Sequence, residues 1–198
     1  LSEVGSVIEE AKMDNQSIDR PPYTHFDTEG IWQWLLLTVN NLADKSKIRA
    51  IVSTTHGCAA ALVDDSELVF PVLDYEEEIP LEISEAFEAV VPSFAETQTP
   101  NLPGGQNLGR QLFWFQRNYP ERFLRVKWIL TYPQYWTWRL SGVAASELTS
   151  IGCHTHLWNP HKRCYSTLVD QQGWGALFPP IRPASDALGP ILSKVAEK

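Results

Sequence analysis

The sequence is poor in cysteine and in basic residues, and both shortages narrow the classes of protein it can encode. Three cysteines in 198 residues, Cys58, Cys153 and Cys164, are too few for the disulfide framework of a small secreted domain. Sixteen Lys and Arg against 24 Asp and Glu give a net charge of -8, and no basic stripe is visible. Nucleic-acid binding needs clustered Lys and Arg to neutralise phosphates. The composition therefore argues against a nucleic-acid-binding protein and favours a reducing, cytoplasmic compartment.

Long apolar runs are missing as well. The longest apolar stretches, such as residues 34–37, fall far short of the roughly 20 residues that a transmembrane helix needs. The first residues contain no charged region followed by an apolar region, which is the pattern of a signal peptide. We therefore expect no membrane association and no secretion.

Tryptophan, in contrast, is abundant. Six of the eight tryptophans lie in the second half of the chain: Trp114, Trp128, Trp136, Trp138, Trp158 and Trp174. Large aromatic rings can line a sugar pocket, and they can equally fill a hydrophobic core. The core is the favoured interpretation.

The apolar spacing predicts a mixture of helices and strands. Helical spacing covers residues 29–44, about 80–90, 108 to the residue before Pro120, 132–140 and 166–172. Short apolar or β-branched runs predict strands at 7–13, 48–54, 58–63, 68–73 and 128–130, and an extended segment at 147–158. Asp27 and Thr28 are candidate N-caps, and Gly142 is a natural residue to end a helix. This order predicts an α/β fold with a sheet of mixed direction.

Two polar residues follow predicted strands. His56 comes at the end of the run 48–54, where α/β sheets usually place ligand contacts, and its imidazole can bond to a hydroxyl or to a backbone carbonyl of the turn. Asp74 ends the run 68–73 and could accept hydroxyl protons or cap the helix near residue 80. We expect both strands to lie side by side, with their ends opening onto one polar cleft.

A second polar cluster contains Cys153, His154, His156, His161 and Cys164 within twelve residues. Zinc accepts such ligands. The spacing is irregular, however, and contains no Cys-x-x-Cys. Histidines on a solvated edge are the favoured interpretation, and we assign no metal ligand.

Several short motifs are spaced over residues 5–190. They are His25-Phe26-Asp27 before Ile31-Trp32, residues 48–57, the hairpin from Asp64-Asp65 to Asp74, residues 112–115 before Pro120-Glu121-Arg122-Phe123, Leu140-Ser141-Gly142 before residues 146–150, and Phe178-Pro179-Pro180 with Leu188-Gly189. None is specific alone. Their shared order and spacing resemble the N-terminal domain of the FGGY family of carbohydrate kinases.

The resemblance implies a fold and a set of expected absences. It implies a ribonuclease-H-like, actin-type α/β domain, with residues 1–198 as one partial, sugar-binding domain. The family's Asp-x-Gly-x-Thr strand is expected before Leu1, because the chain begins within a hairpin. The catalytic Asp and the ATP-binding domain are expected beyond Lys198. We therefore assign no catalytic residue to this chain and expect it to be inactive by itself.

The resemblance also implies the sugar site. His56 and Asp74 match family positions at the pocket, while Gln106 and Asn107 lie in a loop where the pocket receives a side chain or where they cap a helix. The family's Gln-Met is Thr54-Thr55 here, and its Trp and Arg are Val72 and Glu76. These departures concern the identity of the sugar. They leave the family pattern intact.

The implied activity is ATP-dependent phosphorylation of a hydroxyl of a ketose or related sugar, with ATP and Mg²⁺ as cofactors whose ligands lie mostly elsewhere. The implied partner is a small-molecule sugar, with no nucleic acid and no membrane. The choice between a monomer and a homodimer stays open. The alternative functions are a stand-alone carbohydrate-binding module that uses tryptophan platforms, and a zinc-dependent interaction domain.

Overall fold

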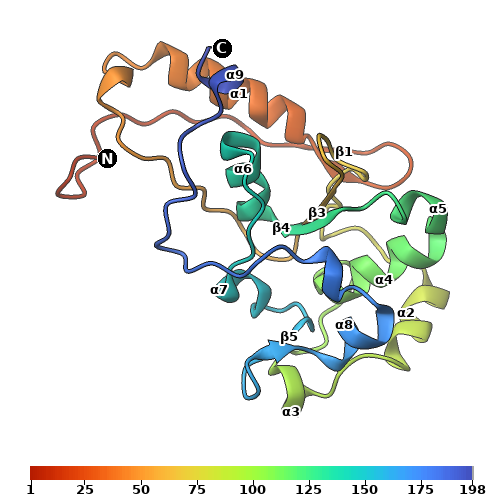
Figure 1. Cartoon of the computed structure of the whole chain (residues 1–198). Helices are drawn as coiled ribbons and strands as arrows, with labels where there is room; N and C mark the ends of the chain where they lie inside the picture. The colour runs from red at the N-terminus through yellow and green to blue at the C-terminus, as the bar shows by residue number, and fades with distance from the viewer. Residues whose placement is uncertain (198) are drawn as a thin grey trace.

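A computed structural model describes residues 1–197 of the chain (Figure 1). The helices are α1 (Thr28–Asn41), α2 (Leu81–Glu88), α3 (Phe94–Thr97), α4 (Leu108–Asn118), α5 (Pro120–Phe123), α6 (Tyr132–Ser141), α7 (Leu148–Ile151), α8 (Thr167–Gln172) and α9 (Ser193–Ala196), with 3-10 turns at Lys45–Lys47 and Gly175–Leu177. The strands are β1 (Ser17–Ile18), β2 (His25–Phe26), β3 (Ala60–Val63), β4 (Trp128–Thr131), β5 (Trp158–Asn159) and β6 (Cys164–Tyr165).

The antiparallel ribbon of β3 and β4 forms the middle layer of the fold. Its register runs from Ala60 opposite Thr131 to Val63 opposite Trp128. Because successive strand residues point to opposite faces, Ala60 and Leu62 enter one hydrophobic core while Ala61 and Val63 enter another. Figure 1 shows helices on both sides of the ribbon, with α1 and α6 on one side and α4 on the other.

The larger core lies on the α4 side of the ribbon. Residues 108–115 of α4 are all buried, and Phe115 stacks on Phe70 with ring centroids 4.9 Å apart. Gly109 allows this helix to approach the turn near residue 155, since a Cβ there would lie 2.9 Å from the carbonyl oxygen of Thr155. The N–H of Gly109 donates to that same oxygen at 2.9 Å. The start of α4 is thus fixed against the C-terminal half of the chain.

The smaller core lies between the ribbon, α1 and α6. Trp32 of α1 stacks on Trp136 of α6 at 6.5 Å, and the guanidinium of Arg139 lies 4.3 Å from the Trp32 ring centre. Arg139 also pairs with Glu29 at 3.0 Å. The apolar stripe predicted for residues 29–44 therefore does face a partner helix, as an amphipathic helix must.

The tryptophans belong to the core. Trp32, Trp114, Trp136 and Trp174 are buried, and none of the other four is exposed within the described residues. The core interpretation of the tryptophan content is confirmed for the buried four. No exposed indole is left to act as a platform for a sugar.

The predicted helices and their ends agree with the structure. α1, α2, α4, α6 and α8 occupy the five segments with helical spacing. Asp27 caps α1 by accepting from the N–H of Gly30 at 2.8 Å. Gly142 ends α6 with a φ of 76°, a left-handed conformation that favours glycine. Strands β3 and β4 also lie where predicted.

Other predicted elements are wrong, and most of these are predicted strands that have no neighbouring strand to pair with. Residues 7–13 and 48–54 form no strand, and 68–73 makes only single bridges at Leu68 and Leu73. The segment 147–158 is not extended, since it contains α7. An apolar, β-branched run becomes a strand only when a neighbouring chain satisfies its N–H and C=O groups. Within residues 1–197 no chain segment does this for 7–13 or 48–54.

The predicted mixed central sheet is therefore not formed by the described residues. Strand pairing there consists of three antiparallel pairs, β1 with β2, β3 with β4 and β5 with β6, and three isolated bridges. The bridges at Leu68 and Leu73 are antiparallel, and the one between Ser146 and Ile181 is parallel. The helix–strand–helix layering of an α/β protein is present. Within residues 1–197, no helix has the length and apolar character required to cross a bilayer.

Candidate sugar-binding site

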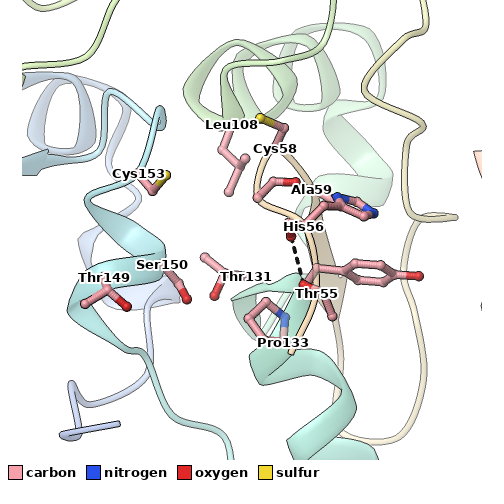
Figure 2. Close-up of a pocket in the computed structure, with 12 residues that line it drawn as sticks. Thr55, His56, Cys58, Ala59, Leu108, Thr131, Pro133, Thr149, Ser150 and Cys153 are labelled. Carbon is pink, nitrogen blue, oxygen red and sulfur yellow. Dashed lines mark hydrogen bonds between the residues drawn. The ribbon is translucent and has the colours of Figure 1, made fainter. Parts of the chain in front are cut away.

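A cavity of about 160 Å³ lies at the entrance to β3, between the starts of α4, α6 and α7. Figure 2 shows the segment 55–59 on one side of it and α7 with Cys153 on the other. It is lined by Thr55, His56, Gly57, Cys58, Ala59, Leu108, Thr131, Tyr132, Pro133, Thr149, Ser150 and Cys153. The cavity is of the right order of size for a small sugar.

His56 is among the lining residues and stands before a sharp turn, and Figure 2 shows its imidazole pointing away from α7. Cys58 has a φ of 59°, in the left-handed region that an L-residue with a side chain occupies at a cost of about 1–2 kcal/mol. Immediately afterwards the chain enters β3, which is buried at every position. The turn thus connects an extended, exposed segment to a rigid strand. Strained backbone of this kind is common where a ligand contact has to be aimed.

Three aromatic rings surround the imidazole of His56. Its ring centre lies 5.1 Å from that of Phe26, 5.2 Å from Tyr75 and 5.2 Å from Tyr132. Tyr132 itself stacks on Phe26 at 5.7 Å. Although His56 remains solvent-exposed, these rings limit the orientations that its side chain can take.

The hydrogen bonding of His56 fixes its tautomer. Nδ1 lies 2.6 Å from the carbonyl oxygen of Gly57, which can only accept. Nδ1 must therefore carry a proton, and in the neutral imidazole Nε2 is left as an acceptor. Among the described residues Nε2 has no partner. The side chain of His56 thus makes the predicted bond to a backbone carbonyl through Nδ1, and its Nε2 is left free to accept from a hydroxyl.

Hydroxyl groups form the opposite wall. Glu147 caps α7 by accepting from the N–H groups of Thr149 and Ser150, each at 3.0 Å. Partial burial raises the pKa of Glu147, but these hydrogen bonds outweigh it and hold the pKa below its usual range. The carboxylate therefore stays ionised and keeps the start of α7 in place. Thr149 and Ser150 line the cavity from that position (Figure 2).

No charged side chain is among the described residues that line this cavity. A second cavity of about 760 Å³ adjoins it and shares Thr55, Pro133, Thr149 and Ser150. The larger cavity is lined largely by residues 48–55 and 182–191, and it carries Arg49 and Arg182 together with Glu147 and Asp186. Arg182 is paired with Asp186 at 2.8 Å. The charged side chains thus lie in the larger of the two neighbouring cavities.

Asp74 does not line either cavity. Its carboxylate accepts from the hydroxyl of Ser17 and, at 3.0 Å, from the N–H of Glu76. Its neighbour Tyr75 packs on His56, so the two segments are close, but the predicted pair of strand ends does not form. The structure gives no bond from Asp74 to cap α2, whose N-cap is Pro80. A sugar contact by Asp74 stays a prediction.

Gln106 and Asn107 also lie outside the cavity linings. Asn107 is fully buried: it accepts from the N–H of Leu102 at 2.8 Å and donates to the carbonyl oxygens of Pro100 and His154. These bonds join the loop before α4 to the C-terminal half, and none of them caps the helix. Gln106 is half-buried in that loop. Their contact with a sugar stays a prediction.

The Cys and His cluster at 153–164 is dispersed in the fold. Cys153 lines the small cavity, His156 is buried beside Phe87, and His161 bonds to Gln98 at 3.3 Å. Cys164 is exposed. The part of the chain that the structure describes contains no group of three or more His, Cys, Asp or Glu placed to hold a metal ion.

The buried His156 should make the protein less stable in mild acid. Burial, together with the nearby Arg110 cation, lowers the pKa of His156 to about 4, although Glu88 acts in the opposite direction. Unfolded His156 binds a proton below its ordinary pKa of about 6.5, whereas folded His156 stays neutral. Its contribution is therefore present above pH 6.5 and is lost as the pH falls towards 4, with a slope of up to about 1.4 kcal/mol per pH unit.

Urea unfolding between pH 4 and 7 measures this slope. A His156→Leu variant should unfold with a smaller pH dependence in that window, and an exposed-site His161→Leu variant should keep the parental dependence. Equal slopes for all three proteins would contradict the assignment to His156.

Several lining residues were not found by sequence reasoning. Thr131 follows the predicted strand 128–130, Thr149 and Ser150 belong to the motif at 146–150, and Cys153 was a candidate zinc ligand, but none of the four was assigned to the sugar site. The available signal was Glu147 directly before Leu148-Thr149-Ser150, which is a cap followed by a short helix. A short helix predicted after Glu147 would have placed the hydroxyls of Thr149 and Ser150 near the entrance to β3.

Comparison with known proteins identifies the family of this chain. The sequence model of the N-terminal domain of the FGGY family of carbohydrate kinases matches residues 1–198. A carbohydrate kinase from Novosphingobium aromaticivorans is 36% identical over 92% of this chain, with a TM-score of 0.88. The chain therefore belongs to the FGGY family of carbohydrate kinases, as the order of motifs predicted.

More distant solved structures share the fold. A xylulose kinase from Rhodospirillum rubrum matches all of the chain at 18% identity and a TM-score of 0.80. The glycerol kinase of Plasmodium falciparum, solved with ADP, matches 97% of it at 12% identity and a TM-score of 0.78. The chain spans about 40% of the length of these solved kinases (40, 43 and 42% for the three described). Comparison with curated proteins finds no match.

Proposed function

We propose that this chain is the sugar-binding part of an ATP-dependent carbohydrate kinase that phosphorylates a hydroxyl of a ketose or related neutral sugar. The observation that carries the proposal is the hydroxyl-lined cavity at His56, in a chain whose whole length matches the family's N-terminal domain. Four of the eight tryptophans are buried and the other four are half-buried, which argues against the alternative of a stand-alone binding module that uses tryptophan platforms.

The composition of the cavity supports a neutral polyol. A sugar hydroxyl is both a donor and an acceptor, and the cavity offers the hydroxyl side chains of Thr149 and Ser150 on one wall and residues 55–59 on the other (Figure 2). We propose that the unpartnered Nε2 of His56, whose imidazole points away from α7 in Figure 2, turns to accept from the sugar when it binds. No Lys or Arg is among the described lining residues of this cavity, so it offers the carboxylate of a sugar acid no cationic side chain. On this ground we propose sugars without a carboxylate as the substrates.

Phosphoryl transfer requires alignment of the sugar, a base for its hydroxyl proton and a metal-bound triphosphate. We assign only alignment to this chain, through His56 and the cavity. The described residues contain no group of three or more His, Cys, Asp or Glu placed to hold a metal ion. We propose that other residues of the protein hold both, and that residues 1–198 act as one domain with them.

We also propose that residues 48–54 become a strand of the mixed central sheet of the ribonuclease-H-like fold. The backbone of residues 49–54 makes no backbone hydrogen bond within the described part of the chain, and Val52 is 84% exposed. A run of this composition is unfavourable in water without a partner strand. Strand pairing would also hold the His56 turn from its N-terminal side.

A coupled ADP-release screen tests the proposed function. The protein expressed from its complete coding sequence is supplied with ATP, Mg²⁺ and one compound at a time from a panel of neutral ketoses, polyols and sugar acids. We expect ADP release with at least one neutral compound and none with the sugar acids. ADP release with no neutral compound, measured against a mock purification, would contradict the proposal.

A further inference from the structure

We infer that Gln111 is a positioning residue for the sugar site: its side-chain amide ties the His56–Cys58 turn to the loop that carries Gln106. The expected effect on KM rests on the proposed function. The expected effect on the conformation of the His56–Cys58 turn does not depend on that function. Gln111 is fully buried within α4 and does not line the cavity.

The two N–H groups of one side chain hold two separate segments. Nε2 of Gln111 donates to the carbonyl oxygen of Cys58 at 2.8 Å and to that of Gly105 at 2.5 Å. The first acceptor lies two residues after His56, and the second lies directly before Gln106. A single amide therefore sets the distance between the two segments.

The turn has few other restraints. Among the described residues, the bond to the Cys58 carbonyl is the only hydrogen bond that ties the backbone of 49–58 to another segment. The other restraint on the turn is the packing of the His56 ring on Phe26, Tyr75 and Tyr132. Cys58 is also the residue in the left-handed conformation. Without its anchor the turn can relax towards an ordinary backbone conformation, which would rotate His56 away from the cavity.

The anchor itself is rigid. Gln111 is flanked by the buried Leu108, Leu112 and Phe115 of α4, and the start of α4 is bonded to Thr155. Oε1 of Gln111 is buried and has no partner among the described residues. Burying Oε1 without a hydrogen-bond partner costs free energy, and an apolar side chain that only filled the space would avoid this cost. The two donated bonds are what the glutamine contributes.

The test uses Gln111→Met in the protein expressed from its complete coding sequence, since methionine has a similar length and no donor. Gln116→Met is the matched control: Gln116 lies on the same helix and also makes two hydrogen bonds, to Gln172 and Trp174. Maleimide labelling of Cys58, Cys153 and Cys164, followed by mass spectrometry, reports the turn without any substrate.

We expect Gln111→Met to speed the labelling of Cys58 by about fivefold, because burial now raises the pKa of that thiol and restrains it. Labelling of Cys164 should not change, and Gln116→Met should resemble the parent protein. With a sugar that is phosphorylated, KM should rise about tenfold in Gln111→Met with kcat within about twofold.

Parental Cys58 labelling and parental KM in Gln111→Met would overturn the inference. If no sugar is phosphorylated by the parent protein, the proposed function fails while the Cys58 result still decides the role of Gln111. If Gln111→Met does not fold, Gln111→Asn, which is too short to reach both carbonyls, should give the same faster labelling of Cys58. Unchanged labelling in that variant would equally overturn the inference.

Discussion

Replacing His56 with alanine is expected to lower kcat/KM for the phosphorylated sugar by about 10- to 100-fold, which corresponds to about 1.4–2.7 kcal/mol. The substitution removes the acceptor Nε2 and with it the proposed hydrogen bond from a sugar hydroxyl. That hydroxyl would then face the methyl group of alanine. A lost hydrogen bond to a buried polar partner typically costs about 1–3 kcal/mol. Steady-state kinetics of the ADP-release assay give the value.

Matched variants separate a lost contact from a damaged fold. His161→Ala removes an exposed histidine whose bond is to Gln98, far from the cavity lining, and should keep the parental kcat/KM. His56→Gln keeps an acceptor on a side chain of similar reach and should recover part of the activity. A His56→Ala enzyme with parental KM and kcat would remove His56 from the sugar site.

The periodic parts of the fold could be predicted from the sequence because local spacing alone decides them. α1 and α6 bury residues that lie three to four positions apart, such as Thr28 and Trp32 in α1, and the β3 run alternates between two cores. The ends of α1 and α6 were also predictable, since Asp27 and Gly142 satisfy local needs of the helix. These elements position the site.

The failures concern features that depend on distant residues. Residues 48–54 have the composition of a central strand, yet a strand needs a neighbour that local sequence cannot supply. His156 was interpreted as a histidine on a solvated edge, and only the packing of Phe87 against it explains its burial. The role of Gln111 could not be predicted from the sequence. One polar residue inside an apolar helix does not indicate which backbone carbonyls its side chain will bind, here those of Cys58 and Gly105.

The larger core should be the least tolerant part of the molecule, and Trp174→Ala should destabilise it by about 3–5 kcal/mol. Trp174 is fully buried, directly after Gly173 ends α8 with a φ of 74°, and its indole N–H donates to Gln116 at 3.0 Å. Alanine would leave a cavity and an unpaired amide oxygen. Because domains are stable by only about 5–15 kcal/mol, this single change removes a large share of the total.

Urea unfolding followed by circular dichroism measures the effect without relying on tryptophan fluorescence. Leu124→Ala is the control, because Leu124 is 80% exposed and its truncation should change stability by less than about 0.5 kcal/mol. Trp174→Phe should fall between the two, since it keeps an aromatic ring but loses the donor. A loss below about 1 kcal/mol in Trp174→Ala would mean that the core around α4 and α8 closes over the space, contrary to the close packing of protein interiors. The position of α4, and with it the anchor of the His56 turn, would then be set by fewer contacts than the structure indicates.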